Sequence, residues 1–158
     1  MTGKVNRFGN GPELIQFCYY WLPPLLLTAG IIIIAGDLGS VSHFRLPLKI
    51  LSFLLPSYSP KAIYALYLKL RKVGHFLAYA LLFGAYARAW CWHLGKTRLK
   101  TIFLSLAICL LVSVSDEARQ TFYNSRTGNP WDVLLDMSGS LTAALVLFPW
   151  LRPEDQLK

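Results

Sequence analysis

Long apolar runs are the feature of this sequence that most limits the folds open to it. Four such runs follow one another along the chain. The third is short, and we count the polar residues that follow it, up to residue 120, as the end of the same span. They cover residues 14–35, 73–92, 101–114 and 131–150. A helix needs about 20 mostly apolar residues to cross the hydrocarbon core of a bilayer. The pattern therefore predicts an all-α integral membrane protein with four transmembrane helices.

The composition excludes several other classes of protein. Hydrophobic residues make up 54% of the chain and charged residues 15%, with a mean hydropathy of +0.42, whereas about 25% of the residues of a soluble domain are charged. Intrinsic disorder is excluded because a chain this apolar must bury much of its surface. The net charge of +8 would suggest nucleic acid in a soluble protein. Here it indicates loops that lie against anionic lipid head groups, so we expect membrane lipids as partners and no nucleic acid.

A long connection, residues 36–71, separates the first two runs. Pro47, Pro56 and Pro60 divide it into pieces that are too short to span a bilayer. Its last part, Ala62 to Lys72, is an amphipathic segment that ends in three cations. Such a segment is typical of a helix that lies in the membrane interface, with its basic side among the phosphates. We therefore expect an interfacial amphipathic segment between the first and second transmembrane helices.

These features divide the chain into three parts. Residues 1–71 form the first transmembrane helix and the interfacial connection, residues 72–151 a helical region, and residues 152–158 a short polar tail. With four spans, both termini and the loop between the second and third runs share one side of the membrane. The cations divide equally between the two sides, but this tight loop carries three of them, Lys96, Arg98 and Lys100, and no acidic residue. Because short basic loops stay in the cytoplasm, we expect both termini there.

Ionisable side chains near the ends of the later runs are the candidate functional residues, because such groups are costly inside a membrane. They are His75, Asp116, Glu117, Asp132 and Asp136, and the neutral amide Gln120 belongs to the same set. In the four-span arrangement they all lie at the same side of the membrane, where they can converge in one polar pocket with Arg119 and Arg126. Crowded carboxylates need counter-charges or a bound cation. We expect no cofactor, while a divalent cation at the carboxylates is one way to satisfy them.

Asp136 has the most restrictive position of this set. Asp132, Asp136 and Gly139 are spaced i, i+4 and i+7, so they share one face of a helix, and a glycine there permits close contact with another helix. Burying an unpaired carboxylate one turn inside a membrane span costs several kcal/mol of free energy. We therefore expect Asp136 to face the interior, within reach of Glu117, Gln120 or Arg126.

Each of these residues also has a simpler interpretation. A histidine at a helix end is more often an interface residue or an interhelical hydrogen-bond partner. The acidic residues are also consistent with helix ends that reach water, where the helix dipole favours Asp132, and Arg126 with a head-group anchor. The sequence contains no HExxH, GxSxG, CxxC or Walker pattern. We therefore lean against an enzyme and leave the question open.

Two stretches of the sequence resemble the VanZ-like family. KVGHFLAYALL, beginning at Lys72, is similar to the family's K-x-x-H-F-x-x-Y-x-x-L and adds Tyr79 to the candidate site. DEARQTFYNSRTGNPWDVLLDMSG, beginning at Asp116, is similar to D-E-x-x-Q-x-F-x-x-x-R-x-G-x-x-x-D-x-x-x-D-x-x-G. The positions that fall on this second pattern include Glu117, Gln120, Arg126, Asp132, Asp136 and Gly139. One departure is Arg71, where many members have an acidic residue before the lysine.

The resemblance implies a small multi-pass protein of the bacterial inner membrane. The family's namesake is associated with low-level resistance to the glycopeptide teicoplanin, although the resemblance supplies no mechanism. It suggests a polar pocket that binds the head group of an envelope lipid or a cell-wall precursor. In this interpretation Arg126 contacts an anionic group, while the carboxylates and Gln120 accept hydrogen bonds or hold a cation.

Two further functions remain open. One is a membrane-embedded enzyme acting on a lipid-linked substrate, with His75 and a carboxylate as an acid–base pair or with a divalent metal held by the carboxylates. The other is a non-catalytic accessory subunit of a larger membrane protein complex, in which the aromatic residues pack against other transmembrane helices.

Overall fold

The computed structural model describes residues 13–35, 45–94, 98–121 and 130–151. Every regular element in this part of the chain is an α-helix, so the predicted all-α class is confirmed there. The helices are α1 (Glu13–Ala35), α2 (Arg45–Leu54), α3 (Pro60–Leu94), α4 (Arg98–Thr121) and α5 (Pro130–Leu147).

Two of the described helices, rather than the expected four, are long and apolar enough to cross a membrane by length and composition. They are α1, over Glu13–Ile33, and α4, over Arg98–Arg119. The other two long helices fall short of this criterion: α3 contains His75 and Arg88, and α5, only 18 residues long, contains Asp132 and Asp136. The candidate site residues therefore lower the mean hydropathy of the helices that hold them.

The connection between the first two runs is more helical than the sequence suggested. Residues 62–72, expected to be a separate interfacial segment, are the first part of the 35-residue helix α3, which also contains the second apolar run. The expectation of a break between residues 72 and 73 was wrong. Pro60 occupies the first helical position, where a proline starts a helix, and no proline follows it before Leu94, so the helix continues into the apolar run. The separate amphipathic helix of this region is α2, ten residues long.

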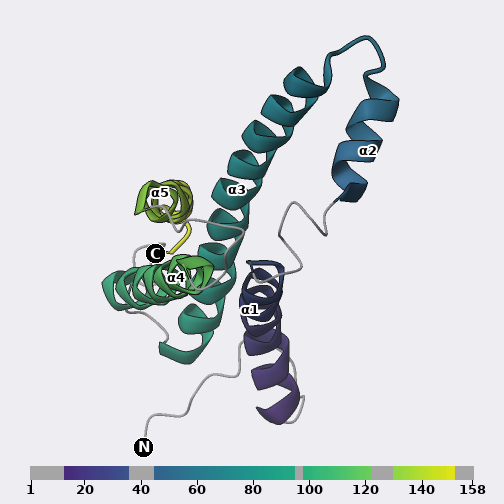
Figure 1. Cartoon of the computed structure of the whole chain (residues 1–158). Coiled ribbons are helices and arrows are strands. Elements are labelled where there is room, and N and C mark those ends of the chain that lie inside the picture. The colour runs from purple at the N-terminus through teal and green to yellow at the C-terminus, as the bar shows by residue number, and fades with distance from the viewer. Residues whose placement is uncertain (1–12, 36–44, 95–97, 122–129, 152–158) are drawn as a thin grey trace, which may run out of the picture.

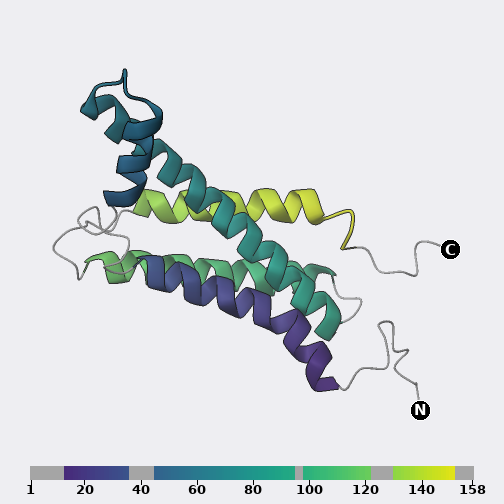
Figure 2. The ribbon, with the colours of Figure 1, turned by 90° about the vertical axis from the view of Figure 1, so that its right-hand side faces the viewer.

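The helix α3 is the centre of the arrangement, because it contacts each of the other four helices. Figure 1 shows it as the longest element, and at about 1.5 Å per residue it measures about 52 Å. In Figure 2 the axes of α1, α4 and α5 are roughly aligned, with α5 antiparallel to the other two, while α3 crosses them at an incline. The helix α2 folds back along the first part of α3, so that these two elements form a helical hairpin at one end of the molecule.

The buried core is small and lies around the middle of α3. Its largest members are Tyr79, Leu82 and Phe83, which pack with Cys109 of α4 and Ala144 of α5. The outer surface is also apolar. Large hydrophobic side chains are exposed on every helix, and they include Leu26, Leu81, Phe103, Leu111, Leu141 and Leu145. So extensive an apolar surface marks a site of interaction with lipid or protein.

Aromatic residues hold α1 against the end of α3 that lies away from His75. The guanidinium of Arg88 lies 4.3 Å from the ring centroid of Tyr19 and 4.6 Å from that of Tyr20, and it donates a hydrogen bond to the carbonyl oxygen of Tyr19. The rings of Trp21 and Trp90 meet edge to face, with centroids 4.8 Å apart. These contacts attach α1, which has few buried side chains, to the central helix.

Candidate functional site

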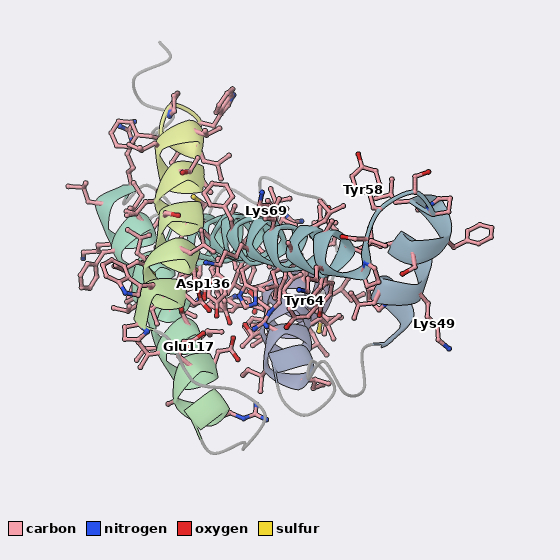
Figure 3. All side chains as sticks on the ribbon, turned by 45° about the horizontal axis from the view of Figure 1, so that its top comes forward. Lys49, Tyr58, Tyr64, Lys69, Glu117 and Asp136 are labelled. Atoms are coloured by element: carbon pink, nitrogen blue, oxygen red, sulfur yellow. The ribbon has the colours of Figure 1, made fainter. Side chains whose placement is uncertain are left out.

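Three acidic side chains are buried inside the helical assembly. Asp116 and Glu117 of α4 are 1% and 7% exposed, and Asp136 of α5 is fully buried. Figure 3 shows the labelled Glu117 and Asp136 among the side chains between the helices. Carboxylates are almost never fully buried unless they are paired, so their partners define the candidate site.

Asp136 connects three helices through its two carboxylate oxygens. Its Oδ1 lies 3.2 Å from Nδ1 of His75 on α3, and its Oδ2 accepts a hydrogen bond of 2.7 Å from the hydroxyl of Ser113 on α4. The expectation that Asp136 faces the interior is therefore confirmed. The structure shows His75 and Ser113 as its hydrogen-bond partners. The expected reach to Gln120 and Arg126 falls outside the described residues, and the reach to Glu117 stays a prediction.

The interaction with Asp136 determines how the His75 ring can act. A carboxylate on Nδ1 fixes the orientation of an imidazole and its tautomer, which leaves Nε2 to bind a ligand or to exchange a proton. The side chain of His75 is 24% exposed, whereas that of Asp136 is fully buried. The histidine is therefore the member of this pair that a ligand outside the helices can reach.

Asp116 and Tyr79 belong to the same cluster. Asp116 lies near both His75 and the Tyr79 phenol, and Tyr79 also lies near Asp136 and Ser113. Tyr79 is 1% exposed. The structure therefore brings together four of the residues selected from the sequence, which are His75, Tyr79, Asp116 and Asp136.

The close contact between α5 and α3 sets the register of this cluster. A Cβ atom on Gly139 would overlap the carbonyl oxygen of Phe76, so this position has no room for a side chain. One residue further along α5, the Ser140 hydroxyl lies 3.3 Å from the carbonyl oxygen of Tyr79, to which it donates a hydrogen bond. These contacts hold α5 at the height on α3 that places Asp136 opposite His75, which confirms Gly139 as a position of close helix approach.

The other candidate residues have different positions. Asp132 lies one helical turn before Asp136 and is only partly buried. Arg119, expected as a partner of the acidic cluster, donates a hydrogen bond of 2.9 Å to the carbonyl oxygen of Ile32 and so joins α4 to α1. The side chain of Gln120, although it belongs to α4, and the whole of Arg126 lie outside the described residues.

Metal binding is one chemistry that these residue types allow. Within the described parts of the chain, no three His, Cys, Asp or Glu side chains are grouped so that they could hold a metal ion. The divalent cation considered for the carboxylates stays a prediction. The contacts that the structure does show suit hydrogen bonding to a polar group and proton transfer at His75.

Sequence reasoning missed Ser113, which donates the shortest hydrogen bond to Asp136. A signal for it exists, because Thr101, Ser105, Cys109 and Ser113 repeat every four residues on α4 and are all fully buried. Small polar residues at this spacing mark a helix face that packs closely against other helices. The apolar-run interpretation overlooked the pattern because single serines barely change the hydropathy of a run.

Comparison with known proteins gives one match. The family model described as VanZ/LLP1 matches residues 21–152, which extends beyond the motif region at residues 72–148 to α2 and most of α1. The comparisons with curated proteins and with solved structures found no match. The family model covers most of the chain, including every residue of the cluster around Asp136, and the chain therefore belongs to the VanZ-like family.

Proposed function

We propose that this VanZ-like protein is a four-span protein of the bacterial inner membrane whose buried polar cluster binds the head group of an envelope lipid or a cell-wall precursor. The observation that carries the proposal is the burial of Asp116 and Asp136 beside His75, with Glu117 buried next to Asp116 on α4, inside helices with an apolar outer surface. Acidic and imidazole groups inside membrane helices usually belong to sites for substrates, ions or protons.

Membrane insertion of all four long helices is supported by their outer surfaces. Leu77 and Leu81 of α3 are 53% and 65% exposed, and Leu141 and Leu145 of α5 are 48% and 76% exposed. Their exposure is similar to that of the apolar residues on α4, such as Leu111 at 67%. The polar residues of α3 and α5 that reduce their hydropathy include the inward-facing pair His75 and Asp136, which have each other as partners.

The direction of the helices supports a position of the polar cluster near one membrane surface. In Figure 2 the C-terminal ends of α1 and α4 and the N-terminal end of α5 lie at the same end of the molecule. With both termini in the cytoplasm, as proposed, this end faces outward, where envelope lipids and cell-wall precursors present their head groups. Labelling of single cysteines in intact cells tests the orientation. A cysteine at Trp131 should react with an impermeant reagent, and one at Leu99 should not.

The chemistry of the cluster suits a head group that carries hydroxyls and a phosphate. Carboxylates such as Glu117 accept hydrogen bonds from hydroxyl or amino groups, and Nε2 of His75 can bind a hydroxyl or phosphate oxygen. We assign the contact with the anionic group to Arg126, because a guanidinium recognises phosphate with two parallel hydrogen bonds. The partner is therefore a phosphorylated envelope lipid with a hydroxyl-rich head group.

Binding is tested with purified protein and a lipid-linked cell-wall precursor, measured by native mass spectrometry. We expect the Glu117→Gln and His75→Ala variants to lose most of the bound precursor. The control is Ser138→Ala, since this hydroxyl donates only to the carbonyl oxygen of Leu135 in its own helix. Equal retention of the precursor by all variants, or none by the wild-type protein, would contradict the proposed binding site.

The link to glycopeptide resistance requires a test in cells. A deletion strain should become more sensitive to teicoplanin, and a plasmid copy of the gene should restore the original sensitivity. The Asp136→Asn and Glu117→Gln variants should fail to restore it, although they reach the same level in the membrane as the wild-type protein. Unchanged sensitivity of the deletion strain would exclude the resistance role. It would not bear on binding of the precursor, which the mass spectrometry experiment tests separately.

A second candidate function is favoured by the contact between His75 and Asp136. A histidine oriented by a carboxylate is the arrangement of a general base, in which Nε2 takes the proton. This candidate is an enzyme that acts on a lipid-linked substrate. Incubation of the purified protein with radiolabelled envelope lipids separates the two functions: formation of a product that His75→Ala abolishes supports the enzyme, and unchanged lipid supports binding alone.

A further inference from the structure

The helical hairpin formed by α2 and the first part of α3, residues 45–72, has an unusual charge pattern and is called the basic hairpin below. No Asp or Glu occurs anywhere between residues 38 and 115. The lysines of the hairpin are all exposed, and they are Lys49, Lys61, Lys69 and Lys72. The hairpin therefore presents positive charge that no acidic side chain of its own neutralises. Figure 3 shows Lys49 at the edge of the molecule and Lys69 on the first part of α3.

The hairpin also exposes large apolar side chains. Phe53, Leu54 and Ile50 of α2 are 84%, 64% and 50% exposed. Their spacing places them on one face, because residues three and four positions apart are neighbours on a helix. Lys49 and Ser52 are exposed beside this face. A helix with an apolar face, a basic edge and little other polar surface is the kind that lies in a membrane interface.

The direction of α2 fits such a position. In Figure 2, α2 runs across the direction of α1, α4 and α5, and it lies at the end of the molecule where α5 begins. If the bundle helices cross a membrane, α2 lies along its surface. The elbow of the hairpin also contains an apolar hollow of about 240 Å³, lined by Leu55, Tyr58, Ala62, Ile63 and Leu66. An apolar hollow next to unneutralised lysines suits an amphiphile with an anionic head.

We infer that the basic hairpin binds anionic phospholipid, with its lysines at the phosphates and the apolar face of α2, centred on Phe53, among the upper parts of the acyl chains. The inference rests on the membrane insertion proposed above. Charge complementarity selects anionic lipid, because each cation near a negatively charged surface attracts it. An acidic protein partner would use the same lysines but would leave the apolar face of α2 unaccounted for, so it is an outcome that the experiment must distinguish.

The position of the hairpin is measured with a nitroxide label on the full-length protein in nanodiscs that contain phosphatidylcholine and phosphatidylglycerol. Cys18 and Cys91 are first replaced by serine, while Cys109 is buried and stays. Single cysteines are then placed at Phe53 and at its neighbour Ser52. We expect the label at Phe53 to be accessible to oxygen and protected from a soluble nickel chelate. The label at Ser52, on the polar edge of the same helix, should be accessible to the chelate.

A third label at Leu111, on the apolar outside of α4, distinguishes failure of this inference from failure of membrane insertion. If the label at Leu111 is accessible to oxygen while the label at Phe53 is accessible to the chelate, the lipid contact of the hairpin is overturned. Membrane insertion of the bundle is then still supported. Leu111 open to the chelate overturns insertion and, with it, the inference. Protection of Phe53 only after an acidic protein is added would show that the hairpin binds a protein instead.

The choice of lipid is measured by native mass spectrometry, comparing retention of phosphatidylglycerol and phosphatidylcholine. Removal of one interfacial cation should weaken binding of the anionic lipid about fivefold, so we expect that loss in Lys69→Gln and a larger one in the combined Lys61→Gln, Lys69→Gln and Lys72→Gln variant. Lys100→Gln, which changes another exposed lysine on α4, is the matched control. An equal loss in Lys100→Gln, or equal retention of the two lipids by the wild-type protein, overturns the assignment to the hairpin.

Discussion

The carboxylate of Asp136 on α5 lies 3.2 Å from Nδ1 of His75 on α3, although the two residues are 61 positions apart in the chain. The contact joins two helices that also meet at Gly139 and Phe76. It links the packing of the helices to the chemistry of the candidate site, because the register that brings the helices together also orients the imidazole. Changes to the packing and changes to the charged pair should therefore be separable by experiment.

Substitutions of Asp136 should separate its polar role from its structural role. Asp136→Asn keeps a side chain that can hydrogen-bond to His75 and Ser113, so the fold should remain while binding of the precursor falls. Asp136→Leu leaves the fully buried Ser113 and the partly buried His75 without an acceptor, and an unsatisfied buried group costs about 1–3 kcal/mol. Unfolding of the protein in mixed micelles by increasing SDS measures the free energy difference, with Thr142→Val at an exposed position of α5 as the control. Equal stability of Asp136→Leu and wild type would show that the pair does not support the fold.

Enlarging Gly139 should destabilise the contact between α3 and α5. Gly139→Ala places a Cβ against the backbone oxygen of Phe76, and overpacking of this kind costs about 1–3 kcal/mol. Gly74→Ala is the matched control, since nothing lies within 4 Å of the added Cβ there. In that variant we expect stabilisation by about 0.4–1 kcal/mol, because alanine restricts the unfolded chain. The same SDS titration compares the two, and a Gly139→Ala protein as stable as Gly74→Ala would contradict this packing.

Loss of the Ser113 hydroxyl should weaken the site more than loss of another serine on the same helix. Ser113 donates to the carboxylate of Asp136 at 2.7 Å, and hydrogen bonds to charged groups contribute about 1.5–3 kcal/mol. Ser105, also fully buried, donates to the carbonyl oxygen of Thr101 in its own helix. We therefore expect Ser113→Ala to reduce both stability and precursor binding, and Ser105→Ala to leave binding unchanged. Equal binding by the two variants would remove Ser113 from the site.

Removal of the Arg88 guanidinium should loosen α1 without changing the cluster around Asp136. Arg88 contacts the rings of Tyr19 and Tyr20, and such contacts contribute about 0.5–1 kcal/mol at exposed sites. Limited proteolysis of Arg88→Gln in detergent should cleave α1 faster than in wild type, while retention of the precursor stays the same. Lys100→Gln, also exposed, should behave like wild type. Unchanged cleavage of Arg88→Gln would show that the aromatic contacts do not hold α1.

The helical class and the apolar outer surfaces could be predicted from the sequence, because both follow from the local order of residues. The apolar runs anticipated α1, α4, α5 and the second part of α3. Asp132, Asp136 and Gly139 share one face of a helix, and this spacing correctly indicated that Asp136 faces inward. The extent of α3 could not be read in the same way, since the change at residue 73 from a basic amphipathic segment to an apolar run leaves the backbone helix unbroken.

The identity of the partners depended on the tertiary structure. Sequence spacing states which residues share a face of one helix, and it contains no information on the height at which two helices meet. That height depends on the fit of Gly139 against Phe76 and of Ser140 against Tyr79. The sequence by itself determined that Asp136 must have a buried partner, because an isolated carboxylate in an apolar environment is too costly. Only the tertiary structure decided that this partner is His75, together with Ser113, because a helix register of a few ångströms selects which polar atoms come within hydrogen-bond distance.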